Sequence, residues 1–371
     1  MYREAYVKID IDAFKYNIKN IIEKSKKKII AIIKADAYGC GAKYLFNAAV
    51  EAGASMFGVS SLEEAIKLRE DGCNSDILIL GHTGSENLDL IKQYDFILTS
   101  VSKDWVNEFS KFDGNGIKVH IKVDTGMNRI GLKTLEEVNE SIKLLNDSNY
   151  KVDGIYTHFA CADEDFNKKT KSQYEMFKNI VEKSNYDFKW IHCSNSDASL
   201  SIEDNLCNSV RIGLSLYGVN AYYKDLKPVV SLLCKIVNIK TLHEGETVSY
   251  GATYVCNEND IIATVPLGYA DGLRRNYSGR RVFIEGASGQ IVGRVCMDQT
   301  MIKLDKIMPL KTEVEIFGTH IPLEEVAEDL DTVAHEILTS LSDRLTRIYI
   351  EEGKYLTDMN PRLKKGEINQ N

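Results

Sequence analysis

The sequence lacks several features that mark particular classes of protein. It has only five prolines and two tryptophans, and it has no low-complexity segment. No apolar run approaches the length that a membrane-spanning helix needs. The chain starts with Tyr2-Arg3-Glu4 and mixed polar residues, which is not the pattern of a secretory signal. We therefore expect a cytoplasmic protein that does not contact a membrane.

Metal-ligand spacing and an excess of basic residues are absent as well. The eight cysteines include no Cys-x-x-Cys pair and no nearby histidine pair, so we expect reduced thiols and no metal site. Lysine and arginine number 46 against 54 aspartates and glutamates, a net charge of −8. This balance argues against a nucleic-acid partner.

The first part of the chain shows a regular alternation of strand-like and amphipathic stretches. The 371 residues suit two domains. The eight strand candidates of the first part are Ile29–Lys34, Met56–Ser60, Asp76–Leu80, Phe96–Thr99, Lys118–Asp124, Val152–His158, Trp190–Ser194 and Ser209–Gly213. Eight strands alternating with helices in about two hundred residues predict a (β/α)8 barrel. A doubly wound sheet is the alternative, disfavoured because no Gly-x-Gly-x-x-Gly follows a strand.

After about residue 223 the pattern changes to short strands joined by Gly-rich turns, which predicts a mainly-β second domain. We place the barrel at residues 1–225 and the β domain at residues 226–371. The alternating stretch Ala5–Ile11 could add an edge strand to the second domain.

One lysine stands out for its position. The apolar run Ile29–Ile33 leads directly into Lys34, which is followed by Tyr38 and two glycines. A lysine at the end of a buried strand is costly to desolvate as a cation, so its pKa should fall and the amine could attack a carbonyl. The structural alternative is a strand-end lysine that reaches back to water.

Chemistry in such barrels lies at the carboxyl ends of the strands. Reading off those ends gives an amine, two imidazoles, small hydroxyls and arginines on one rim. The residues are Lys34, Tyr38, Lys122, Asp124, Arg129, Tyr156, His158, His192, Ser194, Asn195, Ser196, Arg211 and Gly213.

Seven motifs, in order along both domains, resemble the alanine racemase family. They are Lys34–Gly39 (KADAYG), Lys122–Arg129 (KVDTGMNR), Thr157–Ala160 (THFA), His192–Ser196 (HCSNS), Val248–Gly251 (VSYG), Gly268–Gly272 (GYADG) and Cys296–Gln299 (CMDQ). The resemblance implies a pyridoxal 5'-phosphate enzyme with a barrel and a β domain, which works as a head-to-tail homodimer with shared active sites on a small amino acid.

The resemblance also implies two catalytic bases. Lys34 would hold the cofactor as a Schiff base and act on one face of the substrate Cα. Tyr250, supplied by the other subunit, would act on the opposite face, because a single lysine cannot reach both. A tyrosine has a reference pKa of about 10, which nearby cations would have to lower.

Further roles follow from the same resemblance. Arg211 would face the cofactor's ring nitrogen and donate to it without losing its proton, with His158 beside the ring and His192 supporting Arg211. The phosphate would be held by Tyr38, Ser196 and the backbone of Gly213 and Leu214, and Asn195 would also bind the cofactor. Arg129, Met297 and Tyr269 would meet the substrate or line its entry. Lys122 matches a lysine that some members carry as a carbamate.

Three positions depart from the family pattern. Cys40 stands where histidine is usual, and Asn128 where glycine is frequent. His335 falls where a tyrosine commonly touches the phosphate and narrows the entrance. A smaller side chain there could admit serine or larger amino acids beside alanine.

Three other functions are compatible with the sequence. The chain could be a non-catalytic cofactor-binding barrel, although such relatives are shorter and lack the β domain. It could be an amino-acid decarboxylase of the same fold, but Met297 follows Cys296 where those enzymes carry aspartate. It could also be a cofactor-free aldolase that uses Lys34.

Overall fold

The computed structural model describes residues 3–164, 168–202, 204–360 and 362, and the chain divides into two compact units. One unit runs from Phe14 to Lys227, and the other joins the residues up to Ala13 to those from Pro228 onward. The division at 225/226 expected from the sequence therefore differs mainly at the start, where the strand before Ala13 pairs with strands of the second unit.

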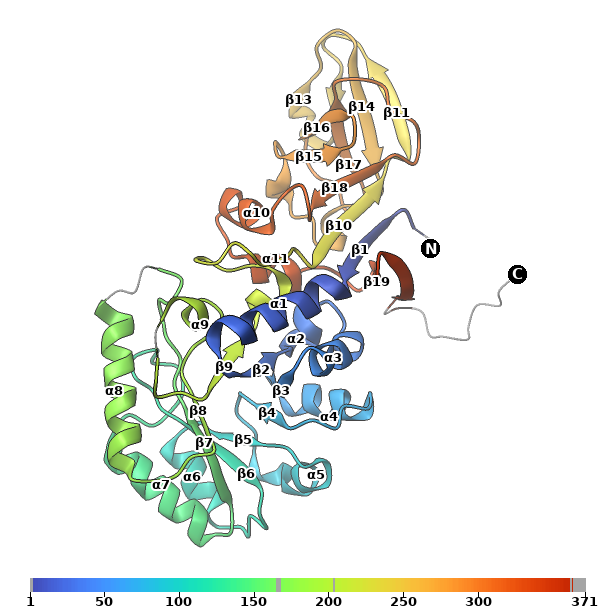
Figure 1. The fold of residues 1–371 in the computed structure, drawn as a ribbon. Coiled ribbons are helices and arrows are strands. Elements are labelled where there is room, and N and C mark those ends of the chain that lie inside the picture. The colour runs from blue at the N-terminus through green and yellow to red at the C-terminus, as the bar shows by residue number, and fades with distance from the viewer. Residues whose placement is uncertain (1–2, 165–167, 203, 361, 363–371) are drawn as a thin grey trace. The chain divides into compact units, whose positions relative to one another are not determined.

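The first unit is built on eight parallel strands (Figure 1). They are β2 (Lys28–Ile32), β3 (Ala54–Val59), β4 (Ile77–Ile79), β5 (Leu98–Ser100), β6 (Lys118–Lys122), β7 (Lys151–Tyr156), β8 (Trp190–His192) and β9 (Ser209–Ile212). Two ladders run in the orders β4-β3-β2-β9 and β5-β6-β7-β8. A parallel bridge from Leu78 to Ile97 joins the ladders on one side, and the Arg211 amide donates to the Ser194 carbonyl at 3.0 Å on the other. The predicted (β/α)8 barrel is confirmed.

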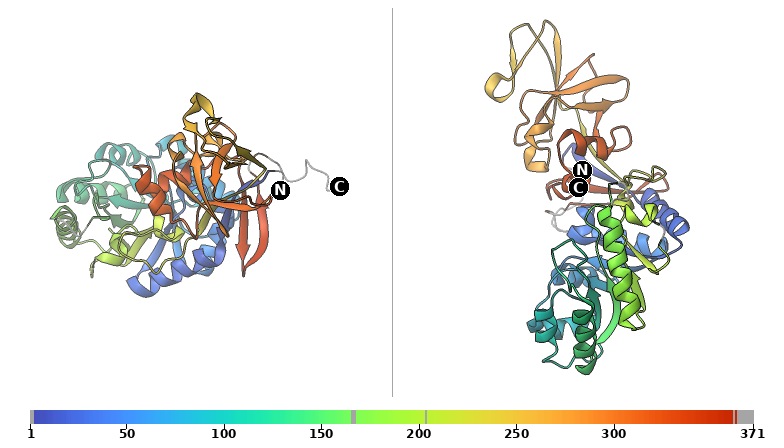
Figure 2. Two further views of the ribbon diagram at one scale, coloured as in Figure 1. Left: turned by 90° about the horizontal axis from the view of Figure 1, so that it is seen from above. Right: turned by 90° about the vertical axis from the view of Figure 1, so that its left-hand side faces the viewer.

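Helices alternate with these strands along the chain (Figures 1 and 2). They are α1 (Ile11–Ser25), α2 (Lys34–Tyr38), α3 (Ala42–Glu51), α4 (Leu62–Glu70), α5 (Leu88–Tyr94), α6 (Lys103–Phe109), α7 (Leu135–Asp147), α8 (Lys168–Ser184) and α9 (Ala198–Ser201). In α7, Val138, Ile142 and Leu145 are buried on one face, and Thr134 and Glu137 form a capping box at the start. The helix begins where side chains satisfy its free amides and packs through its apolar stripe.

Strands end earlier than the apolar pattern predicts where the site begins. β2 stops at Ile32, β6 at Lys122 and β7 at Tyr156, although the pattern continues for two residues in each case. The backbone leaves the ladder at these points, so the polar side chains that follow lie beyond the carboxyl ends of the strands, on α2 after β2 and on loops after β6 and β7.

The second unit has a ten-stranded sheet in the order β11-β14-β17-β16-β15-β18-β10-β1-β19-β20, and a small pair of strands, β12 and β13. The strands are β1 (Ala5–Asp10), β10 (Val230–Lys235), β11 (Asn238–Leu242), β12 (Thr247–Val248), β13 (Tyr254–Val255), β14 (Asp260–Val265), β15 (Arg281–Ile284), β16 (Ala287–Val292), β17 (Thr300–Leu304), β18 (Glu313–Phe317), β19 (Thr346–Glu351) and β20 (Lys354–Met359). Its helices are α10 (Leu323–Asp329) and α11 (Ala334–Thr339). The mainly-β second domain is confirmed.

The N-terminal strand is not at an edge. β1 pairs antiparallel with β10 and parallel with β19, so it lies inside the sheet, and Val7 and Ile9 are fully buried. The expectation of an edge strand is wrong because its second partner, β19, lies more than three hundred residues away and gives no local signal.

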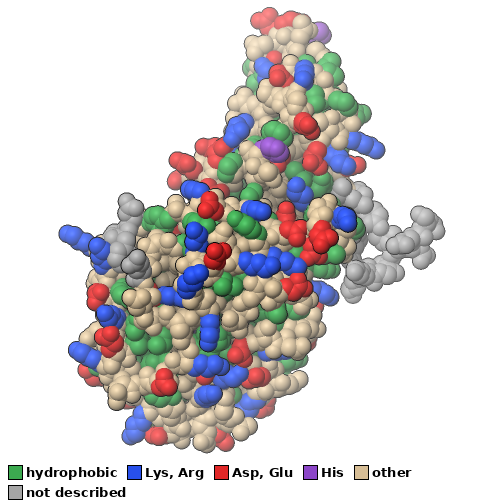
Figure 3. Space-filling model, viewed as in Figure 1, with side chains coloured by type: hydrophobic (Ala, Val, Ile, Leu, Met, Phe, Trp, Pro, Cys, Tyr) green, Lys and Arg blue, Asp and Glu red, His purple; other side chains and the backbone are tan. Residues whose placement is uncertain are grey.

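The described helices include none that is long and apolar enough to cross a membrane. On the face drawn in Figure 3, basic and acidic side chains are interspersed over the barrel unit.

Candidate active site

Lys34 opens a left-handed turn directly after β2. Ala35, Asp36, Ala37 and Tyr38 have φ values of 52°, 51°, 55° and 55°. Each non-glycine residue in this region costs roughly 1–2 kcal/mol. The Glu64 carboxylate stabilises the turn, because it accepts hydrogen bonds from the backbone amides of Ala35 and Ser60, each at 2.7 Å.

The Lys34 ammonium group loses its proton more easily than that of an ordinary lysine. Burial, and then the positive charge of Arg129, lower the pKa of Lys34, while Glu64 opposes them. The residue as a whole is exposed, so a ligand can reach the amine. An exposed amine with a lowered pKa can both form covalent bonds and exchange protons.

Arg211, in β9, is the centre of a buried hydrogen-bond network. Its guanidinium donates to His192 Nδ1 at 2.8 Å and to His158 Nδ1 at 3.2 Å. It also donates to the carbonyls of Thr157 at 2.7 Å and Cys193 at 3.1 Å. Because a guanidinium only donates, both imidazoles accept at Nδ1. Each therefore carries its proton on Nε2.

The network extends to a residue that the sequence did not single out. His192 Nε2 lies 3.0 Å from His120 Nδ1, so His192 donates to His120. Burial lowers the pKa of His120 to about 3, and burial and then Arg211 hold the pKa of His158 and His192 well below the usual value. All three imidazoles are thus neutral beside a cationic arginine.

A signal for His120 was available in the sequence. It lies two residues before Lys122 on the same strand, and such residues share a face. The strand β7 makes room for its ring at Gly154, where an added Cβ would lie 2.7–2.8 Å from the imidazole.

Lys122 lies close to the ring of Tyr156, which stacks on His192. The Tyr156 ring stacks on His192 at 4.7 Å between centroids, and Arg211 Cζ and Lys122 Nζ lie 5.0 Å and 5.5 Å from its centroid. Burial, then Arg211, lowers the pKa of Lys122 to about 7, with Asp124 opposing. Lys122 Nζ donates to the Val123 carbonyl at 2.7 Å. The neutral form of this amine is therefore far more accessible near neutral pH than that of an ordinary lysine.

Small and hydroxyl-bearing residues gather where β8 and β9 end. Ser196 Oγ accepts hydrogen bonds from the amides of Gly213 at 3.1 Å and Ser215 at 3.2 Å. Its own proton is left to donate elsewhere. An added Cβ on Gly213 would lie 2.5 Å from Tyr38 Oη, so this position needs glycine for space. Asn195 is turned to the backbone and accepts from the Ala198 amide at 3.1 Å. Leu214 begins the short helix η2 (Leu214–Tyr217).

The loop after β6 carries Arg129. Asp124 Oδ1 accepts from the amides of Gly126 at 3.1 Å and Asn128 at 2.9 Å. Asn128 has φ of 55°, a left-handed conformation that asparagine tolerates better than most residues, so it can replace a glycine there. Arg129 itself is exposed.

A second group of predicted residues lies in the other unit. Tyr250 is 70% exposed and begins the short helix η3 (Tyr250–Ala252). Ser249 before it donates to the Arg294 carbonyl at 2.5 Å and contacts Cys296 Sγ at 3.5 Å. Tyr250 and Met297 line one cavity of about 750 Å³, and both are exposed.

Tyr269 adjoins the same segment. Its amide donates to the Cys296 carbonyl at 2.9 Å, and the Ala270 amide donates to the Met297 carbonyl at 3.0 Å. An added Cβ on Gly268 would lie 2.4 Å from both carbonyls, which explains the glycine.

A buried carboxylate that the sequence did not single out supports this group. Asp271 is fully buried and accepts two hydrogen bonds from Arg3, at 2.5 and 2.6 Å. It also accepts from the Gly268 amide at 2.9 Å, and Arg344 lies 3.5 Å away. Arg344 in turn donates to Asp298 at 2.6 Å. These charges tie the Tyr269 loop to the loop that carries Met297.

The structure gives the contacts of His335 and Cys40, two residues that depart from the family pattern. His335 is exposed on α11, and its carbonyl accepts from Thr339 Oγ1 at 2.8 Å. Its neighbour Glu336 pairs with Arg274 at 2.8 Å. Cys40 is buried, and its thiol lies 3.8 Å from the Tyr38 carbonyl.

The predicted residues thus fall into two groups. The barrel unit contains Lys34, Tyr38, Lys122, Arg129, His158, His192, Asn195, Ser196, Arg211, Gly213 and Leu214. The second unit contains Tyr250, Tyr269, Met297 and His335.

Comparison with known proteins agrees with this geometry. The family model of the alanine racemase N-terminal domain matches residues 9–221, and that of the C-terminal domain matches residues 229–349. Alanine racemase 1 of Bacillus subtilis strain 168 is 36% identical over 98% of this chain and 97% of its own length. The crystal structure of alanine racemase from Bacillus anthracis with bound L-Ala-P has a TM-score of 0.90 at 36% identity, covering 97% of this chain and 98% of that chain. Histidine racemase from Leuconostoc mesenteroides has a TM-score of 0.86 at 29% identity, covering 94% and 99%. The chain belongs to the alanine racemase family.

Proposed function

We propose that the chain is a pyridoxal 5'-phosphate-dependent alanine racemase that interconverts L- and D-alanine. The observation that carries the proposal is the shared rim of the barrel. Lys34, an amine of lowered pKa, directly follows β2, and Arg211 lies in β9, the strand that pairs with β2. The imidazoles of His158 and His192 beside Arg211 are neutral.

The residues present fit this cofactor. Ser196 Oγ has a free donor, and Tyr38 Oη lies so close to Gly213 that only glycine fits. Two hydroxyls beside backbone amides suit a phosphate. Lys34 would hold the aldehyde carbon, and Arg211 would face the ring nitrogen. When bound, the cofactor supplies an electron sink that makes the substrate's Cα proton removable.

The protein's own part is to move protons on two faces of one carbon. Lys34 Nζ would accept or deliver the proton on one face, and Tyr250 Oη on the other. Arg211 would donate a hydrogen bond to the ring nitrogen and keep its own proton, because guanidinium is not deprotonated in proteins. A weaker electron sink limits side reactions such as decarboxylation and transamination. Arg129 and the Met297 backbone would bind the substrate carboxylate.

The proposal includes a homodimer in which the partner subunit supplies the tyrosine. Tyr250 is 70% exposed on its own unit and lines an open cavity there, as expected of a side chain that completes a site on another copy. A cytoplasmic location stays a prediction, to which eight free thiols are suited.

The two-base assignment is tested by exchange in deuterated water. The loaded protein is incubated separately with L- and D-alanine, and α-deuterium incorporation is followed together with circular dichroism. Tyr250→Phe should abolish racemisation, while α-proton exchange persists for one enantiomer, because Lys34 still serves one face. Racemisation by Tyr250→Phe at the wild-type rate would refute the assignment.

A second candidate is a racemase that also accepts serine or larger amino acids. His335 is exposed on α11 where the family commonly has tyrosine, and a structural neighbour of the same fold is a histidine racemase. The ratio of kcat/KM for serine to that for alanine should fall in His335→Tyr. An unchanged ratio would remove this candidate.

A further inference from the structure

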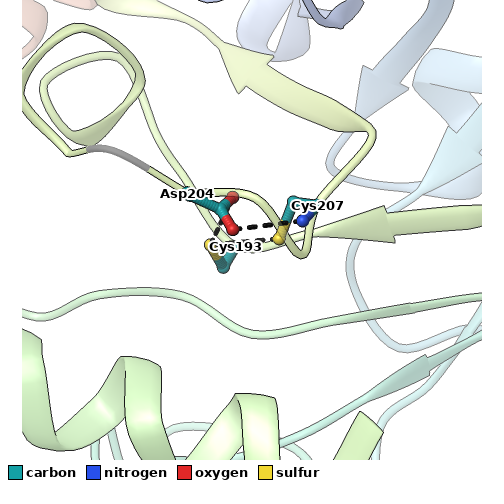
Figure 4. Close-up of side chains that lie close together, drawn as sticks. All are labelled: Cys193, Asp204 and Cys207. Atoms are coloured by element: carbon teal, nitrogen blue, oxygen red, sulfur yellow. Dashed lines mark hydrogen bonds between the residues drawn. The ribbon is translucent and has the colours of Figure 1, made fainter. Parts of the chain in front are cut away.

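Two cysteines meet in the buried interior of the barrel unit. Cys193 directly follows β8, and Cys207 precedes β9. Their sulfur atoms are 3.3 Å apart, with the Cys207 thiol donating to Cys193 Sγ. Cys193 is fully buried and Cys207 is 6% exposed. Figure 4 shows both side chains pointing toward each other beside Asp204.

Asp204 fixes this geometry. Its Oδ1 accepts from the amides of Leu206 and Cys207 at 2.9 and 3.1 Å, and from Tyr174 Oη at 2.9 Å. Its Oδ2 accepts from Lys27 Nζ at 2.7 Å, and the Cys193 thiol lies 3.7 Å away. The carboxylate therefore holds the loop that presents Cys207.

The same contacts disfavour a metal ion. Two thiolates and a carboxylate could in principle ligate a soft divalent cation. However, both Asp204 oxygens already accept several protein donors, and a cation would have to displace the Lys27 ammonium. The two sulfur atoms are closer to each other, at 3.3 Å, than Cys193 Sγ is to Ser194 Oγ at 3.6 Å or to Asp204 Oδ2 at 3.7 Å.

We propose that Cys193 and Cys207 are an oxidative modification site that closes to an intramolecular disulfide when the protein meets a hydroperoxide. The Cys193 sulfur attacks one peroxide oxygen and the O–O bond breaks, which gives Cys193–SOH, while the Cys193 proton passes to the other oxygen, which leaves as an alcohol or water. The Cys207 sulfur then attacks Cys193, the S–O bond breaks, and water leaves with the Cys207 proton. The peroxide is reduced by two electrons and the thiol pair is oxidised by two.

The structure indicates which sulfur attacks first. Cys193 Sγ accepts the Cys207 S–H at 3.3 Å, and the Cys193 S–H donates to Asp204 Oδ2 at 3.7 Å, so the Cys193 proton already faces an acceptor. The hydrogen bond to Cys193 and burial raise the pKa of Cys207, so it stays protonated until the second step. Closing from 3.3 Å to the roughly 2 Å of a disulfide requires a shift of about 1 Å.

The shift would reach the proposed active site through the backbone. The Cys193 carbonyl accepts from Arg211 at 3.1 Å, and the Ser194 carbonyl accepts from the Arg211 amide at 3.0 Å. Movement of Cys193 therefore displaces acceptors that hold Arg211. We expect oxidation to lower racemase activity reversibly, a consequence that rests on the proposed function.

The test uses mass spectrometry of the full-length loaded protein. No lysine or arginine lies between Trp190 and Arg211, so one tryptic peptide, residues 190–211, carries both cysteines. After treatment with hydrogen peroxide and alkylation in denaturant, this peptide should be lighter by two hydrogens and carry no alkyl group. Dithiothreitol should restore two alkylatable thiols and the racemisation rate.

Two variants serve as controls. Cys207→Ser should lose the closed peptide and accumulate sulfinic acid at Cys193, whereas Cys73→Ser, a buried cysteine elsewhere, should behave as wild type. Two alkylated thiols in the wild-type peptide after peroxide would overturn the proposal, as would stoichiometric zinc that the purified protein retains on these thiols. A closed peptide with unchanged activity would overturn only the link to Arg211. Because the mass readout does not depend on activity, failure of the proposed function is distinguishable.

Discussion

The neutral histidine chain predicts a specific pH dependence of stability. The perturbation is a pair of substitutions at His120, which ends the chain from Arg211 through His192. His120→Asn keeps an acceptor near the position of Nδ1 but does not titrate. His120→Phe keeps an aromatic ring and loses both the acceptor and the titration.

The magnitude follows from the pKa difference between the states. Burial lowers the pKa of His120 to about 3 in the folded protein, against about 6.5 in the unfolded chain. Between these values the unfolded state binds more protons, so stability rises with pH and is lost as pH falls below about 6.5. Because pH 5.0 lies about 1.5 units below the pKa of the unfolded state, this one group lowers the free energy of unfolding there by about 2 kcal/mol.

Both variants should therefore lose less stability than wild type between pH 7.5 and 5.0, by about 2 kcal/mol. His120→Phe should carry a further pH-independent loss of roughly 1–3 kcal/mol, because His192 Nε2–H is left buried without an acceptor. Urea unfolding followed by tryptophan fluorescence measures the free energy of unfolding of the barrel unit, which contains His120. Both tryptophans of the chain, Trp105 and Trp190, are buried in the barrel unit.

A wild-type pH dependence in His120→Asn would show that the His120 imidazole is not held neutral in the folded protein. Nitrogen NMR offers an independent check on tautomers. It should find the His192 proton on Nε2, and a proton on Nδ1 would contradict the donor pattern around Arg211.

Three further predictions concern other parts of the site. Gly213→Ala should weaken cofactor binding about tenfold, measured by titration of the cofactor absorbance, because its Cβ would lie 2.5 Å from Tyr38 Oη; unchanged affinity would exclude this cradle. Asp271→Asn should destabilise the second unit by roughly 3–5 kcal/mol, because Arg3 loses its buried partner. Unfolding followed by far-ultraviolet circular dichroism measures this loss, and a value below about 1 kcal/mol would show that the ion pair is dispensable. Lys122, whose pKa is lowered to about 7, should give a carbamate signal with carbon-13 bicarbonate above that pH, and the signal should be absent from Lys122→Arg.

Local pattern identified most elements of the fold because helices and buried strands are set by short-range periodicity. The eight barrel strands and the change to a β domain follow from such runs. The pattern could not find where each strand stops. The left-handed turn at Ala35–Tyr38 depends on Glu64, which lies on helix α4 and accepts the hydrogen bond of the Ala35 amide.

Short motifs and periodicity are enough to assign the family, the barrel and the order of chemical groups along it, since strand ends in such a barrel meet on one rim whatever lies between them. Which of these groups touch depends on how distant segments pack. His120 joins His192, Asp271 joins Arg3, and Cys193 meets Cys207 across separate segments of the chain. The protonation of a buried group depends on such neighbours and on the exclusion of water, and neither is written in the residues next to it.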